Sequence, residues 1–263
     1  MIARILRAYR AELLKGFRLR QAWIGPAVLL VALGIAPLMH PILRDGRSDY
    51  DFIALVTPAT LNLLGFLMLL AGSASLVAQE IGSGSIRLFL VRPVRRSEYL
   101  LAKFLAGASY AVMLTAITAA GTWGIAWVLG ELHGVAFGGQ LVHTSDAMAQ
   151  AYLIGAGLSL LPMLAGVACA MLASVCTRSS GTAVTLTVGF WLVMDMVKHP
   201  LGIDAYVFTT YLEAPWQIFI NRCDGLDAAW WPMAGWCAGV SVCTAVPALA
   251  LAMLVLHRRN FSA

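Results

Sequence analysis

The charged residues of this chain concentrate between Glu80 and Lys103, in the segment EIGSGSIRLFLVRPVRRSEYLLAK. Five of the eighteen Lys and Arg residues lie within it: Arg87, Arg92, Arg95, Arg96 and Lys103. A long apolar run flanks the segment on each side. Short loops rich in Lys and Arg stay on the cytoplasmic face of a membrane. The segment is therefore predicted to be a cytoplasmic loop between two membrane spans.

The same segment carries an apolar stripe. Ile86, Phe89 and Leu90 recur at helical spacing, and Pro93 stops or kinks this short helix because proline lacks a backbone donor. A charged helix with an apolar face needs a surface to dock against. That surface is either a partner protein or the lipid headgroups, and the spacing alone leaves both open.

The remaining patterns do not indicate catalysis. Gly82-Ser83-Gly84-Ser85 lacks the G-x-S-x-G order of a nucleophile elbow, and no His follows on a nearby cytoplasmic segment. The spans lack paired carboxylates, a Ser–His set or a metal motif, which disfavours an intramembrane enzyme. The chain has no G-x-x-x-x-G-K-[ST] sequence, so an ATP-driven process would need a nucleotide-binding partner.

Asp195 is the only acidic residue inside a predicted span, and acids in that position are functional candidates. Lys198 follows three residues later on the same helical face, which favours a local ion pair over an ion or proton site. If Asp195 carried a proton instead, the chain would be a proton-coupled secondary transporter. That function is kept as the alternative.

Histidine and cysteine give weaker signals. Four of the five histidines fall on the predicted exterior side, close to several methionines: His40, His133, His143 and His199. Such residues suit copper or another soft metal, but their spacing is irregular, so no metal site is predicted. Cys223 alone lies in a predicted exterior loop, so no functional disulfide is predicted.

Composition places the whole chain in a membrane. Apolar residues make up 60% of the 263 residues and charged residues 12%, against roughly half and a quarter in soluble domains. Several apolar runs exceed the roughly 18 residues needed to cross the hydrocarbon core, and such spans must be helical because lipid offers the backbone no partners. We predict one all-α integral membrane domain over residues 1–263, with six transmembrane helices at about 23–40, 53–78, 105–129, 151–176, 182–197 and 232–256.

Two further elements are expected to lie along the membrane surface. Residues 1–21 have apolar residues at helical spacing with arginines between them, which is typical of an amphipathic interfacial helix. Residues 199–231 are predicted to form short exterior re-entrant structure, with a helix that starts at Pro215 and stops at Asp224-Gly225. One face of that helix is apolar: Trp216, Phe219, Ile220 and Cys223.

The distribution of charge predicts the topology. With both termini in the cytoplasm, fourteen Lys and Arg residues are cytoplasmic and four are exterior. The inverted arrangement violates the positive-inside rule. The net charge of +5 is thereby explained without nucleic acid binding. Gly235 and Gly239 form a G-x-x-x-G in the last span, which permits close packing of helices within the bundle or between protomers.

The central segment also resembles a known family. Its run E-x-x-x-G-S-x-x-x-F-L-x-x-P-x-x-R-x-x-Y-x-x-x-K is similar to the cytoplasmic loop of permease subunits of type-2 ABC exporters, the ABC-2 membrane family. The matching positions are Glu80, Gly84, Ser85, Phe89, Leu90, Pro93, Arg96, Tyr99 and Lys103. Two features depart from the pattern. Ile81 and Gly82 stand where relatives often carry charged residues, and Ser85 stands where Thr is usual.

The resemblance implies a coupling helix between spans 2 and 3 that inserts into a groove on a separate ATPase subunit, with Arg87 also at this interface. Glu80 would brace the helix by pairing with a basic residue of the partner or of the N-terminal helix. The functional unit would be a homodimer of the permease with two ATPase subunits. They would lie in a bacterial inner membrane, in contact with lipid. The ATPases would bind ATP and Mg²⁺, and the permease would carry no cofactor. Some relatives serve the maturation of exported copper enzymes, and the cargo of this chain is not readable from its sequence.

Overall fold

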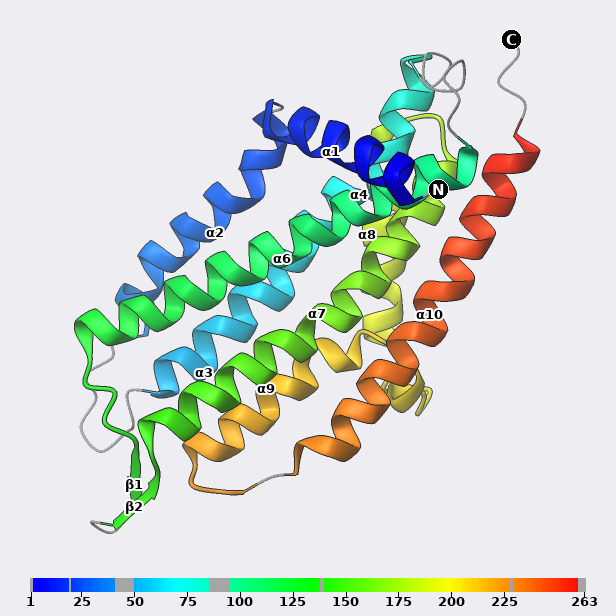
Figure 1. Cartoon of the computed structure of the whole chain (residues 1–263). Coiled ribbons are helices and arrows are strands. Elements are labelled where there is room, and N and C mark those ends of the chain that lie inside the picture. Colours follow the sequence, from blue (N-terminus) through cyan, green and yellow to red (C-terminus); the bar gives the residue numbers. More distant parts are fainter. Residues whose placement is uncertain are drawn as a thin grey trace.

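The computed structural model describes residues 2–18, 20–40, 50–85, 95–137, 140–227 and 229–259. Long helices form an elongated bundle in which α1 crosses one end (Figure 1). The elements in chain order are α1 (Ile2–Arg18), α2 (Arg20–Met39), α3 (Tyr50–Pro58), η1 (Ala59–Gly65), α4 (Phe66–Gly82), α6 (Arg96–Leu129), β1 (Val135–Phe137), β2 (Gln140–His143), α7 (Ser145–Cys176), α8 (Ser180–Val197), η2 (Asp204–Tyr206), α9 (Thr210–Cys223) and α10 (Trp230–Arg258).

Six helical segments of the described chain are long and apolar enough to cross a membrane: Ala22–Met39, Tyr50–Gly82, Arg96–Leu129, Ser145–Cys176, Ser180–Val197 and Trp230–Arg258. The chain is thus an all-α, multi-pass membrane protein, as predicted. Some helices extend beyond their apolar runs. The third span was expected to start near residue 105, whereas α6 begins at Arg96. Glu98 accepts the backbone N–H of Arg95 at 3.0 Å, and this cap adds polar turns to the helix.

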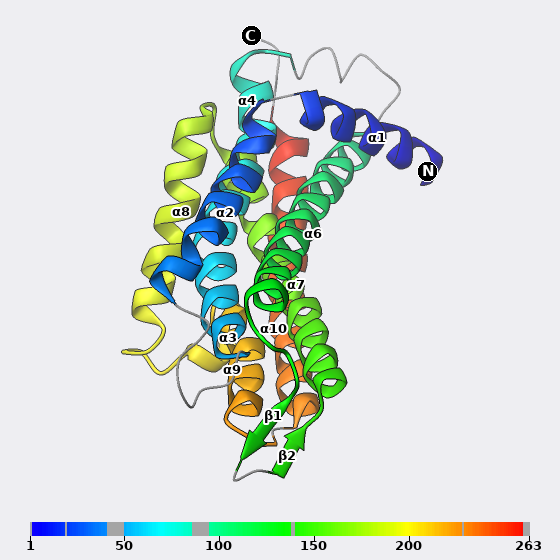
Figure 2. The ribbon, with the colours of Figure 1, turned by 90° about the vertical axis from the view of Figure 1, so that its left-hand side faces the viewer.

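Different elements lie at the two ends of the bundle (Figure 2). One end of the bundle contains α1, the C-terminal end of α4, the start of α6, the α7–α8 turn and the last turn of α10. We call it the α1 end. At the other, called the hairpin end, lie α9 and the antiparallel pair β1 and β2. This hairpin was not anticipated from the sequence.

The second span is irregular. It runs from α3 through the π-helical segment η1 into α4. Asn62 lies in η1, and in the described chain both of its buried amide atoms lack a hydrogen-bond partner. π-helical segments of this kind are rare and are frequent at functional sites. The span that leads into the Glu80 segment is therefore not a uniform α-helix.

The core forms around α7, which packs against α4, α6, α8, α9 and α10. Gly166 of α7 permits the closest of these approaches, because a Cβ atom there would come within 2.5 Å of the Phe66 ring. Phe66 in turn packs edge-on against Trp191 of α8, with 5.5 Å between ring centroids. A small residue on α7 thus brings the fourth span close to the second, and Phe66 joins the second span to the fifth.

The helix before the last span is longer than predicted. Pro215 was expected at its first position, but α9 begins at Thr210, because i→i+3 backbone bonds from Tyr211 and Leu212 build a turn ahead of the proline. Its end is as predicted. Gly225 has φ +75°, and Leu226 donates to the carbonyl of Asn221, which is the hydrogen bond of a Schellman motif. Three of the four residues of the predicted apolar face are buried: Trp216, Phe219 and Cys223.

Candidate functional site

Glu80 lies in the last turn of α4 and is buried. Its Oε1 accepts a hydrogen bond from Lys103 Nζ of α6 at 2.8 Å and one from Lys15 of α1. Its Oε2 accepts a hydrogen bond from the hydroxyl of Tyr99, also on α6, at 2.5 Å. One carboxylate therefore joins three helices.

Lys103 is the second centre of this group. Its side chain is 0% exposed, and Nζ also donates to Glu12 Oε2 of α1 at 2.8 Å. The ammonium lies 5.2 Å from the centre of the Tyr99 ring, where a cation–π contact adds to the ion pairs. We call Glu12, Lys15, Glu80, Tyr99 and Lys103 the buried ion cluster. Its two ammonium groups balance its two carboxylates.

Helical spacing explains why these side chains meet. Tyr99 and Lys103 are four residues apart on α6, and Glu12 and Lys15 are three apart on α1, so each pair shares one helical face. Burying charges is costly unless they are paired, and removing one partner of a buried pair costs about 3–5 kcal/mol. The cluster therefore fixes α1 to both helices that border the 83–95 segment.

The segment after Glu80 begins as a tight turn. Gly84 has φ +71°, a conformation that suits glycine, and the hydroxyls of Ser83 and Ser85 lie 2.9 Å apart. Gly82 packs on the α7–α8 turn so closely that a Cβ atom would lie 2.6 Å from the carbonyl oxygen of Arg178. The Gly-Ser run thus gives close packing and a turn.

Arg96 begins the helix that follows this segment. Its Nη1 donates to the carbonyl oxygens of Leu256 and His257 at 2.8 Å each, and of Arg259 at 3.3 Å. The Arg259 guanidinium donates in turn to the carbonyl oxygens of Thr177, at 3.1 Å, and Val175. We call Arg96 and Arg259 the arginine clamp. It satisfies carbonyl groups that the ends of α10 and α7 leave without helical partners.

A family model described as "ABC-2 family transporter protein" matches residues 18–214, which is most of the chain. The chain belongs to the ABC-2 transporter family. It is accordingly a membrane permease component of an ABC transporter. The matched range contains Glu80, Tyr99 and Lys103, whereas α10 with Arg259 lies beyond it. A comparison with curated proteins finds no match.

The structure brings together some of the residues predicted for the ABC-2 coupling segment. Glu80, Tyr99 and Lys103 form the buried ion cluster, Gly84 and Ser85 form the turn, and Arg96 holds α10. Glu80, Tyr99 and Lys103 are buried among the described residues, where they contact one another and α1. Four predicted interface residues lie outside the described residues: Arg87, Phe89, Leu90 and Pro93.

Sequence reasoning missed Glu12 and Arg259. It expected Glu80 to pair with a basic residue of the partner or of the N-terminal helix, and Lys15 of α1 is such a residue. A signal for Glu12 was present, because it is the only acidic residue among the basic residues of 1–21. An acid in such a helix marks a face that meets a cation of the same protein. No comparable signal marks Arg259, since its acceptors are backbone carbonyls.

The polar pair of the fifth span lies at the end of α8, away from the cluster. Lys198 donates to Asp195 Oδ1 at 2.7 Å, so the ion pair that the spacing favours is present. Lys198 is buried, while the Asp195 side chain is 41% exposed. In the described part of the chain, no group of three His, Cys, Asp or Glu residues could hold a metal ion.

Proposed function

We propose that this ABC-2 permease is the membrane-spanning subunit of an exporter, driven by ATP that a separate ATPase subunit hydrolyses. The ATPase would dock on the 80–103 segment, and the working unit would contain two copies of each subunit. The observation that carries this proposal is the buried ion cluster. It ties both ends of the docking segment to α1, so a force applied there moves several helices together.

The path of that force follows from the contacts. Closure of the ATPases would push on the segment between Ser85 and Arg95. The buried ion cluster would carry the push to α1, α4 and α6, and the arginine clamp would carry it to α10 and α7. A concerted tilt of these helices would change access to a path between the two permease copies.

We further propose that the α1 end faces the cytoplasm of a bacterial inner membrane. The basic α1, the end of α4 and the start of α6, which border the docking segment, and the last turn of α10 all lie at this end (Figure 1). The positive-inside rule supports this orientation. The proton-coupled alternative depends on Asp195, and that carboxylate is already paired with Lys198.

The decisive experiment reverses charge at both ends of the docking segment. In the Glu80→Lys, Arg96→Glu variant, membrane insertion should be retained, while stimulation of the co-purified ATPase by the permease should be lost. Arg7→Glu on the exposed face of α1 is the control. Stimulation at the wild-type level in the double variant would refute the proposed coupling.

A further inference from the structure

A cavity of about 820 Å³ lies at the α1 end, and Lys103, the last residue of the docking segment, is among the residues that line it. Its walls come from α1, α2, α4, α6 and α8, and they are mostly apolar. Among the residues that line it are Met68, Leu76, Ala106, Met113 and Val184. This volume falls within the roughly 300–1,000 Å³ typical of ligand-binding cavities.

The cavity opens on the surface that faces lipid. Phe17, Trp23 and Ile24, at the junction of α1 and α2, line it and are each more than half exposed. On α8, the lining residues Gly181 and Thr185 are exposed as well. Figure 2 shows α2 and α8 on the same side of the bundle. In a bilayer such an apolar opening meets acyl chains and not water.

The charge of the lining also suits a phospholipid. Three charged residues of the described chain line the cavity: Glu12, Lys15 and Lys103. Glu12 and Lys103 form an ion pair and are both buried, whereas the Lys15 side chain is 45% exposed. The charge that the cavity offers to a ligand is therefore positive, and it lies on an interfacial helix, at the depth of the headgroups.

We infer that this cavity binds a phospholipid of the leaflet at the α1 end, with an acyl chain in the apolar part and the phosphate against Lys15. Lys15 also donates to Glu80. The bound phosphate and the Glu80 carboxylate would share one ammonium group, which links the lipid site to the buried ion cluster. This inference goes beyond the proposed coupling and does not depend on it.

Two glycines of α8 allow a matched test of the acyl site. Gly181 lines the cavity, and a Cβ atom there would meet only Ser179 Oγ, at 3.8 Å, among the described residues. Gly189 is not among the lining residues, and in the described chain a Cβ atom there has nothing within 4 Å. A Cβ atom at either position therefore meets no obstacle among the described residues, but only Gly181→Leu adds a side chain that lines the cavity.

The measurement is photo-crosslinking in nanodiscs, with a phospholipid that carries a diazirine on its acyl chain. Wild type and Gly189→Leu should give crosslinks to α1, α2 and α8 residues that line the cavity. Gly181→Leu should lose these crosslinks. If that variant fails to fold, Gly16→Leu fills the same cavity from α1, where a Cβ atom also has nothing within 4 Å in the described chain. Equal crosslinking in the filled and control variants overturns the acyl site.

A second arm tests the phosphate. The same acyl chains on a diazirine diacylglycerol, which lacks phosphate, should crosslink roughly fivefold less, the effect of one partly exposed ion pair. Lys15→Gln should abolish this difference, while Arg10→Gln on the exposed face of α1 should preserve it. Equal labelling by both lipids in wild type overturns the headgroup contact. Neither arm contains an ATPase, so failure here leaves the coupling proposal standing.

Discussion

At the scale of single residues, Lys103 stands out because its ammonium group is fully buried and needs carboxylate partners. A fully buried ammonium is tolerated only where carboxylates accept its hydrogen bonds, and here Glu12 and Glu80 do so from two other helices. Lys198 offers a natural comparison. It is also buried, but its partner Asp195 is partly exposed and can be hydrated if the lysine is lost.

We predict that Lys103→Met destabilises the protein by about 3–5 kcal/mol, because it leaves two carboxylates buried with less compensation. Lys198→Met should cost clearly less. Thermal unfolding in detergent, followed by the loss of monodisperse protein, measures both variants. Equal losses in the two would mean that the cluster is not held by Lys103.

Cys223 is predicted to be an unreactive thiol. Burial raises the pKa of the Cys223 thiol, and the negative charges of Asp51 and Asp224 raise it further. The thiol therefore stays protonated through pH 8, and the thiolate is the reactive form. A maleimide should label the exposed Cys176 but not Cys223 unless the protein is denatured. Rapid native labelling of Cys223 at pH 8 would contradict this.

The residues of the cluster show how far sequence reasoning reaches. Glu80, Tyr99 and Lys103 could be identified because they lie at the edges of apolar runs and fit the ABC-2 pattern. A basic partner for Glu80 on the N-terminal helix was one of the two expectations, and Lys15 is such a partner. Glu12 was not expected, because periodicity alone assigns the polar face of an amphipathic helix to the headgroups. Glu12 instead turns toward α6. The cost of leaving Lys103 unpaired decides that orientation, and this cost depends on tertiary contacts.

At the scale of elements, the contacts that fix the borders of the 83–95 segment are made by the ends of helices and not by their middles. The described borders of the 83–95 segment are fixed by Gly82 against Arg178 and by Arg96 on the end of α10. The number and approximate positions of the spans could be predicted, because they follow from apolar runs, whereas the polar turns that lengthen α6 and α7 could not. The π-helical turn of η1 could not be predicted. Such a turn shifts the register of a polar and an apolar face, and a span that is apolar all round has no such pattern to shift.

Arg96→Ala should loosen the last turn of α10. The guanidinium satisfies carbonyl groups of that turn, and hydrogen bonds from a charged donor are worth about 1.5–3 kcal/mol each. Hydrogen exchange in the last turn should therefore become faster. Arg258→Ala removes an exposed arginine of the same turn and is the control. Unchanged exchange in Arg96→Ala would show that the clamp contributes nothing to that end.

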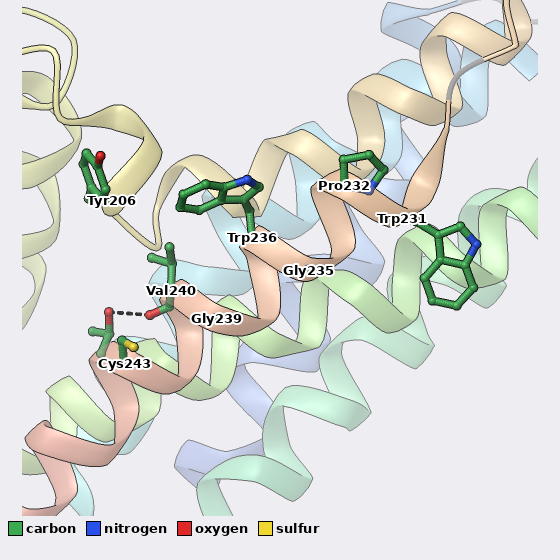
Figure 3. Close-up of a pocket in the computed structure, with 9 residues that line it drawn as sticks. Tyr206, Trp231, Pro232, Gly235, Trp236, Gly239, Val240 and Cys243 are labelled. Atoms are coloured by element: carbon green, nitrogen blue, oxygen red, sulfur yellow. Dashed lines mark hydrogen bonds between the residues drawn. The ribbon is translucent and has the colours of Figure 1, made fainter.

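At the scale of the whole molecule, the last span raises a question of assembly. Gly235 and Gly239 of α10 line a cavity of about 670 Å³ together with Tyr206 and Trp236. Figure 3 shows both glycines on α10, with Trp236 on the side of the helix toward Tyr206. A Cβ atom on either glycine would have nothing within 4 Å in the described chain. The G-x-x-x-G pair is therefore not used for packing among the described helices. Of the two uses that the sequence left open, the contact within the bundle is not made by the part of the chain that the structure describes.

The orientation of the bundle is the prediction on which the proposed function depends most directly. Leu201 lies between α8 and η2 and is 64% exposed, whereas Arg10 lies on the exposed face of α1, at the opposite end of the spans. If the α1 end is cytoplasmic, as the positive-inside rule requires, a membrane-impermeant maleimide added to intact cells should label Leu201→Cys and not Arg10→Cys in a background without native cysteines. Permeabilised cells should label both, which shows that each cysteine is reactive. Labelling of Arg10→Cys in intact cells would place the docking segment outside, where no ATP-hydrolysing partner could reach it.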